Sequence, residues 1–456
     1  MTIPDRPRVV ILGAGFAGLW AARTLSHSQV DVLVLDRNNY HTFFPLLYQV
    51  AAAELEPEDI VYPVRSVLRG QQNIRFLMNE VTEIDLIGKK VKTTDHVFPY
   101  DFLVLGIGST SHFFGVKGAA EYAFQLKTLE EAIALRNHIL FHFERALCET
   151  DPERRQQMLT FAIVGGGATG VEFAGALAEL IRGPLVKDYQ ALDPREMHVL
   201  LLEATDRLLA PFPERLGTYA AKRLQKMGVE IHLRAMVSQI TPEYVQLEEG
   251  TTIPLETVIW TAGVRGESFN AILPTMRNGQ VKVLPTLQTP DYPEVYVIGD
   301  LAFVEADGHS LPMLAPVATQ QGETAAHNII RQVNGQEPVS FHYHNRGTMV
   351  TIGRNAAIAY IGGHAFAGFP AWILWLSIHL YSLISFRNRL LVLVNWSWDY
   401  LFYERAVRLI VSLPVSRTLG PKKIFSGVDS KGPVFPNKTN LGGDDHPEIE
   451  PGRSKP

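Results

Sequence analysis

The chain has 456 residues, of which 46% are hydrophobic, and carries 42 Lys and Arg against 47 Asp and Glu. This length predicts two or three domains, and the net charge of −5 offers no positive field for nucleic acid. Cys148 is the single cysteine. An internal disulfide, a redox-active cysteine pair, and the zinc and iron–sulfur sites that need several thiolates are therefore excluded, and we expect no metal site.

The first elements along the chain are predicted to form a dinucleotide-binding unit. An apolar strand leads into Gly13-Ala14-Gly15-Phe16-Ala17-Gly18, and a second strand ends at Asp36. The first glycine allows a tight turn, the second lets a pyrophosphate approach the backbone, and the third lets helix and strand pack closely. The helix start presents free N–H groups to the phosphates, and Asp36 is placed to bind a ribose diol. The expected elements are a strand over 8–12, a helix over 15–27 and a strand over 30–35.

The same pattern returns at Gly165-Gly166-Gly167-Ala168-Thr169-Gly170, and the strand that follows ends at Glu203. A carboxylate at that strand end binds the adenosine 2′-hydroxyl and repels the 2′-phosphate of NADPH, so NADH is favoured. Arg207, four residues later, leaves NADPH open as a second donor. The expected elements are strands over 161–164 and 199–202 and a helix over 169–182. Two such units predict two dinucleotide sites, as electron transfer between a nicotinamide and a flavin requires.

Glu172 lies on the helix after the second glycine turn. It is either a carboxylate stabilised by the helix dipole or a polar group between nicotinamide and flavin that takes part in proton delivery. The sequence favours neither interpretation.

A late strand over 295–298 ends in Gly299-Asp300 and resembles a return to the first sheet. Together with the first glycine turn, this carboxylate favours FAD at the first site, because Asp300 can meet its ribityl chain or pyrophosphate. Strands that alternate with helices predict an α/β fold of parallel, doubly wound sheets. We therefore expect a split FAD-binding domain, 1–112 plus 290–345, around an NADH-binding domain, 113–289.

The composition changes near residue 366. The stretch 366–386 has no charged residue, and its 21 residues are enough to span a bilayer. Against a span, His379, Ser382 and Ser385 gather on one helical face, and the aromatic segment 390–413 carries charges that a spanning helix would not tolerate. We favour amphipathic helices lying in the membrane interface, with burial in a dimer contact as the competing interpretation.

The end of the chain divides into two regions by composition. Residues 346–420 are expected to form a membrane-attachment region. The Gly-, Pro- and Asp-rich tail over 421–456 has little to bury and is expected to be disordered.

Taken together, these motifs resemble those of the type II NADH dehydrogenases, single-subunit NADH:quinone oxidoreductases that pump no protons. The resemblance covers about 8–413 and rests on segments spread along this range: 13–18, 43–51, 165–175, 261–264, 299–300, 315–322 and 386–389. It implies a glutathione-reductase-like flavoprotein with two Rossmann-type domains and C-terminal amphipathic helices that attach it to a membrane. It also implies that NADH reduces FAD, which then passes two electrons to a membrane quinone.

The resemblance implies roles for residues at matching positions. FAD would be held by Gly13, Gly15, Phe16, Ala17, Gly18, Asp36, Gly108, Asp300 and Ala318. NADH would be held by Gly165, Gly167, Ala168, Thr169, Gly170, Glu203 and Gly263. The quinone would meet Gln49, Pro316 and Gln320. Glu172, beside the NADH site, and Gln320 would be the catalytic residues, the first supporting proton movement and the second orienting the quinone.

The chain departs from the family pattern at two places. Many members have Gln where this chain has Pro316, which removes one hydrogen-bond donor for a quinone carbonyl. Ala51-Ala52-Ala53 stands where many relatives read Ala-Thr-Gly. His379 is interpreted as a residue on the polar side of a helix, with a quinone partner as the alternative.

Two other functions stay open as alternatives. A soluble ferredoxin or rubredoxin reductase shares both glycine turns but has no use for 366–413, and a flavin-binding redox sensor would bind NADH without fast turnover. The resemblance implies a peripheral, monotopic protein on the cytoplasmic face of a membrane. Its partners would be a membrane quinone and the lipid bilayer surface, and a homodimer is left open.

Overall fold

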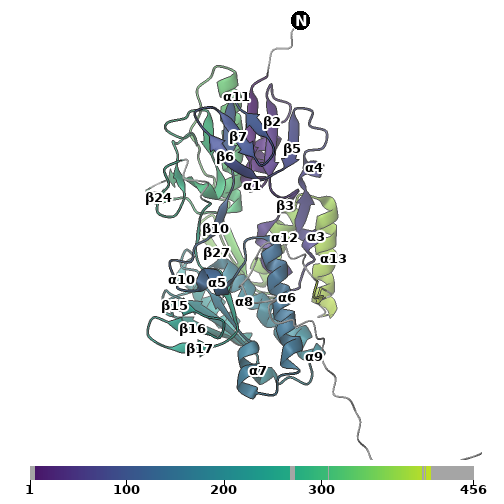
Figure 1. The fold of residues 1–456 in the computed structure, drawn as a ribbon. Coiled ribbons are helices and arrows are strands. Elements are labelled where there is room, and N and C mark those ends of the chain that lie inside the picture. Colours follow the sequence, from purple (N-terminus) through teal and green to yellow (C-terminus); the bar gives the residue numbers. More distant parts are fainter. Residues whose placement is uncertain (1–5, 268–272, 307, 403–404, 406, 412–456) are drawn as a thin grey trace, which may run out of the picture. The chain divides into compact units, whose positions relative to one another are not determined.

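The computed structural model describes residues 6–267, 273–306, 308–402, 405 and 407–411. Its first sheet consists of five parallel strands in the order β21 (Val295–Val297), β9 (Phe102–Leu105), β1 (Arg8–Leu12), β2 (Asp31–Asp36) and β5 (Ile74–Met78) (Figure 1). In the central strand, Val10 pairs with Leu33 on one side and Leu103 on the other. The pairing of β21 with β9 confirms the expected late return of the chain to this sheet.

The second sheet repeats this architecture. Its five parallel strands follow the order β11 (Phe124–Gln125), β18 (Thr257–Trp260), β12 (Thr160–Val164), β13 (His198–Glu203) and β14 (Val229–Leu233). Every residue of β12 and of β18 is buried. Continuous apolar runs of this kind are typical of parallel strands that are covered on both faces. The two sheets confirm the predicted α/β fold with two Rossmann-type units.

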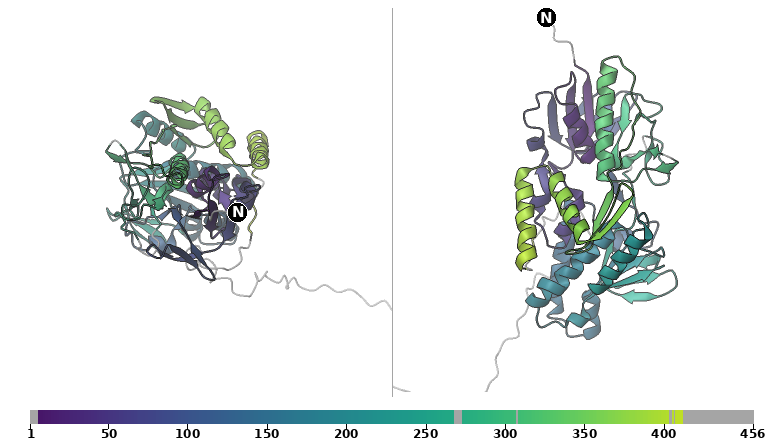
Figure 2. Two further views of the ribbon diagram at one scale, coloured as in Figure 1. Left: turned by 90° about the horizontal axis from the view of Figure 1, so that it is seen from above. Right: turned by 180° about the vertical axis from the view of Figure 1, so that it is seen from behind.

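Two helices that are distant in sequence pack together on the first sheet. They are α1 (Phe16–Thr24) and α11 (Ala315–Val333), and Figure 2 shows the long α11 beside the strands. A Cβ added to Gly322 would lie 2.2 Å from the Ala17 carbonyl oxygen, so this glycine lets the two backbones approach closely.

The longer helices of the second unit are α6 (Leu129–Ala146), α7 (Pro152–Met158), α8 (Ala168–Leu180) and α10 (Glu214–Lys226). Thr128 begins α6 with a reciprocal cap: its hydroxyl accepts the Glu131 N–H, and the Glu131 carboxylate accepts the Thr128 N–H. α8 continues into a π-helical turn, Ile181–Leu185, that contains Pro184.

The remaining strands form small sheets beside the two large ones. They include two three-stranded antiparallel sheets: β6 (Val81–Asp85), β7 (Lys90–Thr93) and β8 (Val97–Pro99), and β15 (Val237–Ile240), β16 (Tyr244–Leu247) and β17 (Thr252–Pro254). They also include three antiparallel pairs: β3 (Tyr40–Thr42) with β4 (Val61–Pro63), β10 (Ser109–Ser111) with β19 (Val264–Gly266), and β23 (Glu305–Ala306) with β24 (His309–Ser310). One parallel pair is β20 (Val281–Lys282) with β22 (Ala302–Phe303). Short α-helices are α2 (Leu47–Ala51), α3 (Pro57–Ile60), α4 (Val64–Val67), α5 (Ala119–Tyr122) and α9 (Val186–Asp188), and 3-10 turns cover Phe44–Leu46, Pro194–Glu196 and Gly299–Leu301.

The expected domain boundaries stay a proposal. The strands of the first sheet fall within 1–112 and 290–345, and those of the second fall within 113–289. Val281 and Leu287, however, pack in the hydrophobic core of the first sheet. We therefore propose that the second boundary lies nearer to residue 280.

The C-terminal part begins with a three-stranded antiparallel sheet, β25 (Thr348–Thr351), β26 (Ala357–Ile361) and β27 (His364–Gly368), followed by α12 (Phe369–Ser382) and α13 (Phe386–Phe402). Figure 2 shows α12 and α13 as neighbours, and the rings of Trp375 and Trp396 lie 5.7 Å apart between them. Residues 412–420 and the expected disordered tail 421–456 lie outside the described residues.

The uncharged stretch 366–386 does not form one continuous helix. It divides into the end of β27, α12 and the first residue of α13. Gly368, at φ +85°, and Pro370 at the start of α12 explain the first break. Among the described residues, no helix has both the length and the apolar character needed to cross a membrane.

Candidate functional site

At the first glycine turn, two glycines are enclosed by protein and one is open. A Cβ on Gly13, at φ +96°, would lie 2.3 Å from the Gly106 carbonyl oxygen, and a Cβ on Gly18 would lie 1.9 Å from the Gly13 oxygen. No atom lies within 4 Å of a Cβ built on Gly15, which precedes Phe16 at the start of α1. The open side is therefore where a phosphate group can reach the helix N-terminus.

Asp36, at the end of β2, closes this turn. Its carboxylate accepts the Ala14 N–H over 2.6 Å and the Asn38 N–H over 2.7 Å. Burial raises its pKa, and these two N–H groups oppose the shift. On the other side, the Ala14 carbonyl lies 3.0 Å from Nδ1 of His41, whose pKa burial lowers to about 4. A neutral His41 that donates to Ala14 thus holds the turn from its second side.

Asp300 begins a chain of polar groups between distant segments. Its Oδ2 accepts the Ser109 hydroxyl over 2.5 Å, and the Ser109 oxygen accepts the Lys127 ammonium over 2.9 Å. Burial lowers the pKa of Lys127, while the charge of Asp300 opposes the shift. Nearby, a Cβ on Gly299 would lie 3.1 Å from Cβ of Ala17 and 3.7 Å from Cβ of Ala318. The structure therefore brings Ala17, Gly299 and Ala318 together.

The second glycine turn has the same geometry. A Cβ on Gly165, at φ +111°, would lie 2.8 Å from the Ala262 backbone, and one on Gly170 would lie 1.9 Å from the Gly165 oxygen. Gly167 faces open space and is exposed, as are Ala168 and Thr169 in the first turn of α8.

Glu203, at the end of β13, holds this turn as Asp36 holds the first. Its carboxylate accepts the Gly166 N–H over 2.5 Å and the Thr205 N–H over 2.7 Å. Arg207 donates to the Ala210 carbonyl over 2.7 Å.

Gly108 and Gly263 lie at the ends of neighbouring segments. Both have left-handed backbones, with φ of +83° and +70°. Gly108 faces open space, whereas the ring of Phe114 lies 2.4 Å from a Cβ built on Gly263. The Gly263 carbonyl also accepts the His112 N–H over 3.2 Å.

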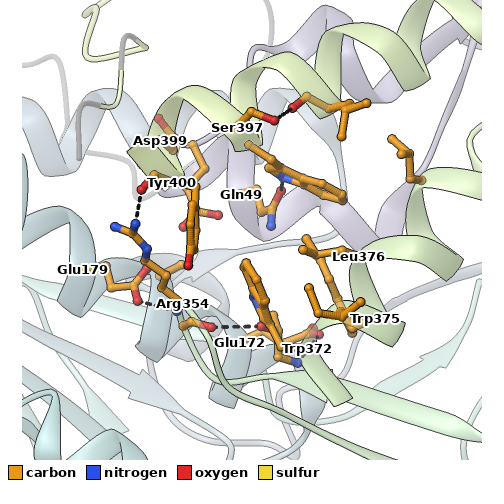
Figure 3. A pocket seen from close by; sticks show the side chains of 18 of the residues that line it. Gln49, Glu172, Glu179, Arg354, Trp372, Trp375, Leu376, Ser397, Asp399 and Tyr400 are labelled. Atoms are coloured by element: carbon orange, nitrogen blue, oxygen red, sulfur yellow. Dashed lines mark hydrogen bonds between the residues drawn. The ribbon is translucent and has the colours of Figure 1, made fainter. Parts of the chain in front are cut away.

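A cavity of about 600 Å³ is bordered by α2, α8, α12 and α13 (Figure 3). Most of its walls are apolar and aromatic, with Phe369, Trp372, Ile373, Trp375, Leu376 and Trp396 among the lining residues. It also contains four carboxylic acids, Glu54, Glu172, Glu179 and Asp399. Apolar walls with a few charged groups are typical of a site for a small organic molecule.

Glu172 faces this cavity from α8. It is the fifth residue of the helix, and the first turn contains no acidic residue. Burial raises its pKa to about 8, against the opposing effects of the Thr351 N–H, 3.4 Å away, and of the Trp375 indole. Glu172 lies beyond the first turn of α8, and the helix-dipole effect falls off within that turn, so the helix-dipole interpretation has little support here. The proton-delivery interpretation stays a prediction.

Gln49 lies in the same cavity and is fixed at both ends of its amide. Its Oε1 accepts the Trp396 indole N–H over 3.0 Å, and its Nε2 donates to the Tyr48 hydroxyl over 3.0 Å. Figure 3 shows Gln49 opposite Glu172. Burial and the nearby carboxylates raise the pKa of Tyr48, so its hydroxyl stays protonated.

Pro316 and Gln320 are not among the residues that line this cavity. Pro316 lies in the first turn of α11, a position that proline favours. The Gln320 amide donates to the His344 carbonyl over 3.1 Å and accepts the His344 N–H over 2.9 Å. Their predicted contact with a quinone stays a prediction.

His379 is not on a polar helix face, so that interpretation is wrong. Its ring stacks on Trp375 with centroids 4.0 Å apart and meets the edge of Phe43. Its Nδ1 lies 2.8 Å from the Trp375 carbonyl, and burial lowers its pKa to about 4. It therefore packs as a neutral aromatic ring.

Sequence reasoning assigned no role to several residues around these sites: His41, Ser109, Lys127, Arg354, Trp375 and Arg405. Each meets partners from other segments, such as His41 with Ala14 and Lys127 with Ser109. Only Trp375 carried a local signal, because a tryptophan in an uncharged stretch suggests an aromatic contact. Taken together, the two glycine turns fit two dinucleotides, and the cavity fits an apolar substrate beside a proton-bearing acid.

Comparison with known proteins identifies two family matches. Residues 7–322 match the pyridine nucleotide-disulphide oxidoreductase family, and residues 345–404 match the NDH2 C-terminal domain. A type II NADH:quinone oxidoreductase of Mycobacterium tuberculosis is 39% identical over 419 residues, covering 88% of this chain and 90% of the relative. The Staphylococcus haemolyticus enzyme of that name is 33% identical over 384 residues, covering 80% and 92%.

Solved structures show the same fold. The structure of NDH2 from Plasmodium falciparum in complex with NADH covers 89% of this chain and 100% of its own, with a TM-score of 0.82 at 18% identity. A ferredoxin reductase from Rhodopseudomonas palustris covers 83% and 96%, with a TM-score of 0.61 at 18% identity.

Proposed function

Since the chain belongs to the type II NADH:quinone oxidoreductase family, we propose that its quinone binds in the cavity bordered by α2, α8, α12 and α13. The observation that carries this placement is that Gln49 and Glu172 line one cavity. Gln49 belongs to α2, within the expected FAD-binding range 1–112, and Glu172 belongs to α8, which begins at the second glycine turn in the expected NADH-binding range 113–289. The cavity thus borders on both units.

FAD, when bound, would supply the redox chemistry that carries two electrons from NADH to the quinone. We infer that its pyrophosphate lies over Gly15, with Phe16 and Ala17 at the helix start, and that Asp36 binds the ribose. Asp300 would meet the ribityl chain, and Ser109 and Lys127 fix the orientation of that carboxylate.

For NADH, we infer a pyrophosphate position over Gly167, where the first turn of α8 presents its free N–H groups. Glu203 would bind the adenosine ribose and keep a negative charge where NADPH carries its phosphate. NADH is therefore the proposed donor.

Two side chains of the cavity suit quinone reduction, which takes up two protons. With a pKa of about 8, Glu172 is mostly protonated at neutral pH and can donate a proton to a quinone oxygen. Gln49 uses one N–H of its amide on Tyr48 and keeps the other for a quinone carbonyl. Gln320 also bonds His344 with only one amide N–H, but it is not among the residues that line the cavity, so Gln49 is the better candidate for orienting the quinone.

The outer faces of α12 and α13 support contact with a lipid surface. Large apolar side chains are exposed there, including Tyr381 and Phe386, each 78% exposed, and Leu401, 71% exposed. The exposed Ser382 returns its hydroxyl to the carbonyl four residues earlier, so it adds no free donor to the surface. We infer that this face lies in the membrane interface, where a quinone can enter the cavity.

We also propose the cytoplasmic face of the membrane as the location. Arg387 lies beside the exposed Phe386, and a cationic group next to an apolar one suits the anionic lipids of that leaflet. A homodimer that buries the same apolar face is the competing arrangement, and the mass of the protein in detergent distinguishes the two.

The test of the quinone site is a substitution that fills the cavity. Ser377 lines it from α12, and Ser382 lies on the same helix but does not. Both hydroxyls are exposed and bond within the helix, so both positions should accept a tryptophan. We expect Ser377→Trp to lower kcat/KM for menadione or a short-chain ubiquinone by roughly tenfold or more, since a filled pocket excludes its ligand.

Reduction of the flavin by NADH, the other half-reaction, provides the control. Bleaching of the flavin absorbance by NADH should proceed at the wild-type rate in both variants, and Ser382→Trp should keep wild-type quinone kinetics. If Ser377→Trp reduces quinone as fast as Ser382→Trp, the cavity is not the quinone site.

A further inference from the structure

Arg405 is a buried arginine at the acidic end of the cavity, with only 6% of its surface exposed. Its Nη1 donates to the carbonyls of Ala52 and Ala176, each over 2.9 Å. Its Nη2 meets Glu54 over 2.5 Å and Glu179 over 3.3 Å. Each terminal nitrogen of the guanidinium therefore contacts two oxygens, one from the segment after α2 and one from α8.

These contacts join three parts of the chain. Ala52 and Glu54 directly follow α2, Ala176 and Glu179 lie on α8, and Arg405 itself follows α13. α2 and α8 are the walls that carry Gln49 and Glu172. α2 and α8 also contact each other directly, and this one side chain adds hydrogen bonds to both of the walls that hold the two proposed quinone-binding groups.

The arrangement needs the guanidinium shape as well as the charge. Four oxygens in different directions match the planar fork of arginine, whereas a lysine ammonium has one nitrogen and three donors. Burial raises the pKa of Glu54 to about 7, and Arg405 opposes that shift. Glu179 is held on its other oxygen by the Arg354 N–H over 2.5 Å, so it cannot follow a displaced partner freely.

We propose that Arg405 is a positioning residue that holds α2 and α8 at their spacing beside the acidic end of the cavity and thereby supports the affinity of the cavity for quinone. This role rests on the proposed quinone site. It differs from that of Arg408, which pairs with Asp188 in α9.

Arg408 provides a matched control in the same segment. It pairs with Asp188 over 2.7 Å and donates to the Arg405 carbonyl, but it is not among the residues that line the cavity. Arg405→Lys and Arg408→Lys both keep a positive charge, so neither leaves an uncompensated buried carboxylate. Both variants should therefore fold and keep FAD.

The experiment measures the two half-reactions and the steady-state constants with menadione and a short-chain ubiquinone. For Arg405→Lys we expect the KM for quinone to rise about tenfold, since two or more charge-assisted hydrogen bonds between the walls are lost. The FAD content, the rate of flavin bleaching by NADH, and kcat at saturating quinone should stay within about twofold of wild type. Arg408→Lys should leave all four quantities unchanged.

A second variant guards against an ambiguous result. Glu179→Gln removes the charge of one wall contact and leaves the Glu54 contact in place, so a smaller rise in KM, about threefold, is expected. The proposal is overturned if Arg405→Lys has the quinone KM of Arg408→Lys, or if its main effect is on FAD content or NADH bleaching. If the wild-type protein is not reoxidised by either quinone, the proposed quinone site itself fails, which is a separate result.

Discussion

Asp36 and Glu203 each accept the backbone N–H of the second residue of the glycine turn beside them, Ala14 and Gly166. The carboxylates therefore fix the two turns, and the rest of their hydrogen-bonding capacity is available to a ribose. A side-chain amide can keep the bond to the turn, because its oxygen accepts the same N–H, but it lacks the negative charge. Charge and turn geometry can thus be separated experimentally.

Glu203→Gln should shift donor preference. Without the carboxylate, the 2′-phosphate of NADPH is no longer repelled, and the bond to the NADH ribose is weaker. We expect the ratio of kcat/KM for NADPH to that for NADH to rise about tenfold, corresponding to about 1.4 kcal/mol. Steady-state kinetics with both donors measure the ratio, and an unchanged ratio would show that Glu203 does not contact the adenosine ribose.

Glu172 should give quinone reduction a dependence on pH. Because burial raises its pKa to about 8, the carboxyl holds its proton below that pH and loses it as the pH rises. The kcat for quinone reduction should therefore fall above about pH 8. In Glu172→Gln the value at neutral pH should be lower by roughly 100-fold, and the alkaline decline should disappear.

The same variant contains its own control for folding. A neutral amide costs less to bury than a carboxylate that ionises, so Glu172→Gln should be at least as thermally stable as wild type at pH 8. A profile identical to that of wild type would remove Glu172 from proton delivery.

The residues that could be predicted from the sequence are those whose chemistry is local. Each glycine turn and the acid at the following strand end belong to the same β-α-β unit. Their spacing along the chain was therefore enough to predict both. His41 and Lys127 could not be found in this way. Their partners, Ala14 and Ser109, are ordinary residues that only the fold brings within hydrogen-bond distance.

At the scale of elements, α13 is attached to the first nucleotide-binding unit by polar contacts under its apolar surface. The buried amide of Asn388 donates to the carbonyls of Glu58, Asp59 and Val61 near α3. Asn395, two turns later, donates to the Asp59 carboxylate over 2.7 Å. One face of the helix is thus specified by hydrogen bonds, which leaves its apolar side chains free to face outward.

Asn388→Ala should loosen α13 locally. The loss leaves three carbonyls without this donor, and an unsatisfied buried group costs about 1–3 kcal/mol. We expect amide hydrogen exchange in 386–402 to accelerate about tenfold or more, with little change in α11. Ser397→Ala is the control, since that hydroxyl bonds only within α13. Equal exchange in the two variants would contradict the role of Asn388.

The strands of both sheets could be predicted because their apolar runs are long and end at glycine. The division of 366–386 could not be predicted with the same ease, since its hydropathy is uniform. Its first residues pair with β26, for example Phe366 with Ala359, and a partner elsewhere in the chain decides strand against helix. The signals that mark the break are Gly368 and Pro370.

At the scale of the whole molecule, exposed apolar side chains gather on α12 and α13, and several of them, including Ile373 and Leu401, also line the cavity. The cavity itself could not be derived from the sequence. Its walls come from α2, α8, α12 and α13, and its acidic end is held by Arg405, which follows α13 but lies far from α2 and α8 along the chain. The sequence pattern predicted an apolar C-terminal surface, but it did not predict the cavity that α12 and α13 help to form.

Charges on this surface should release the protein from lipid. Each large side chain withdrawn from the interface removes about 1.5 kcal/mol or more, so the double variant Phe386→Glu with Leu401→Glu should weaken binding to anionic vesicles by about 100-fold. Ile87→Glu is the control, since Ile87 is 88% exposed but lies between β6 and β7. Flotation of vesicles measures the bound fraction, and equal binding by both variants would argue for a dimer contact instead.

We propose that this chain takes electrons from NADH and delivers them to a quinone bound between α2, α8, α12 and α13. Anaerobic double-mixing stopped-flow absorbance tests it most directly. The purified protein is mixed first with one equivalent of NADH and then with menadione. We expect the flavin absorbance to be lost in the first step and to return in the second, with a slower return in Ser377→Trp than in wild type. A bleached flavin that menadione does not reoxidise, or one reoxidised equally fast in Ser377→Trp, would contradict the claim.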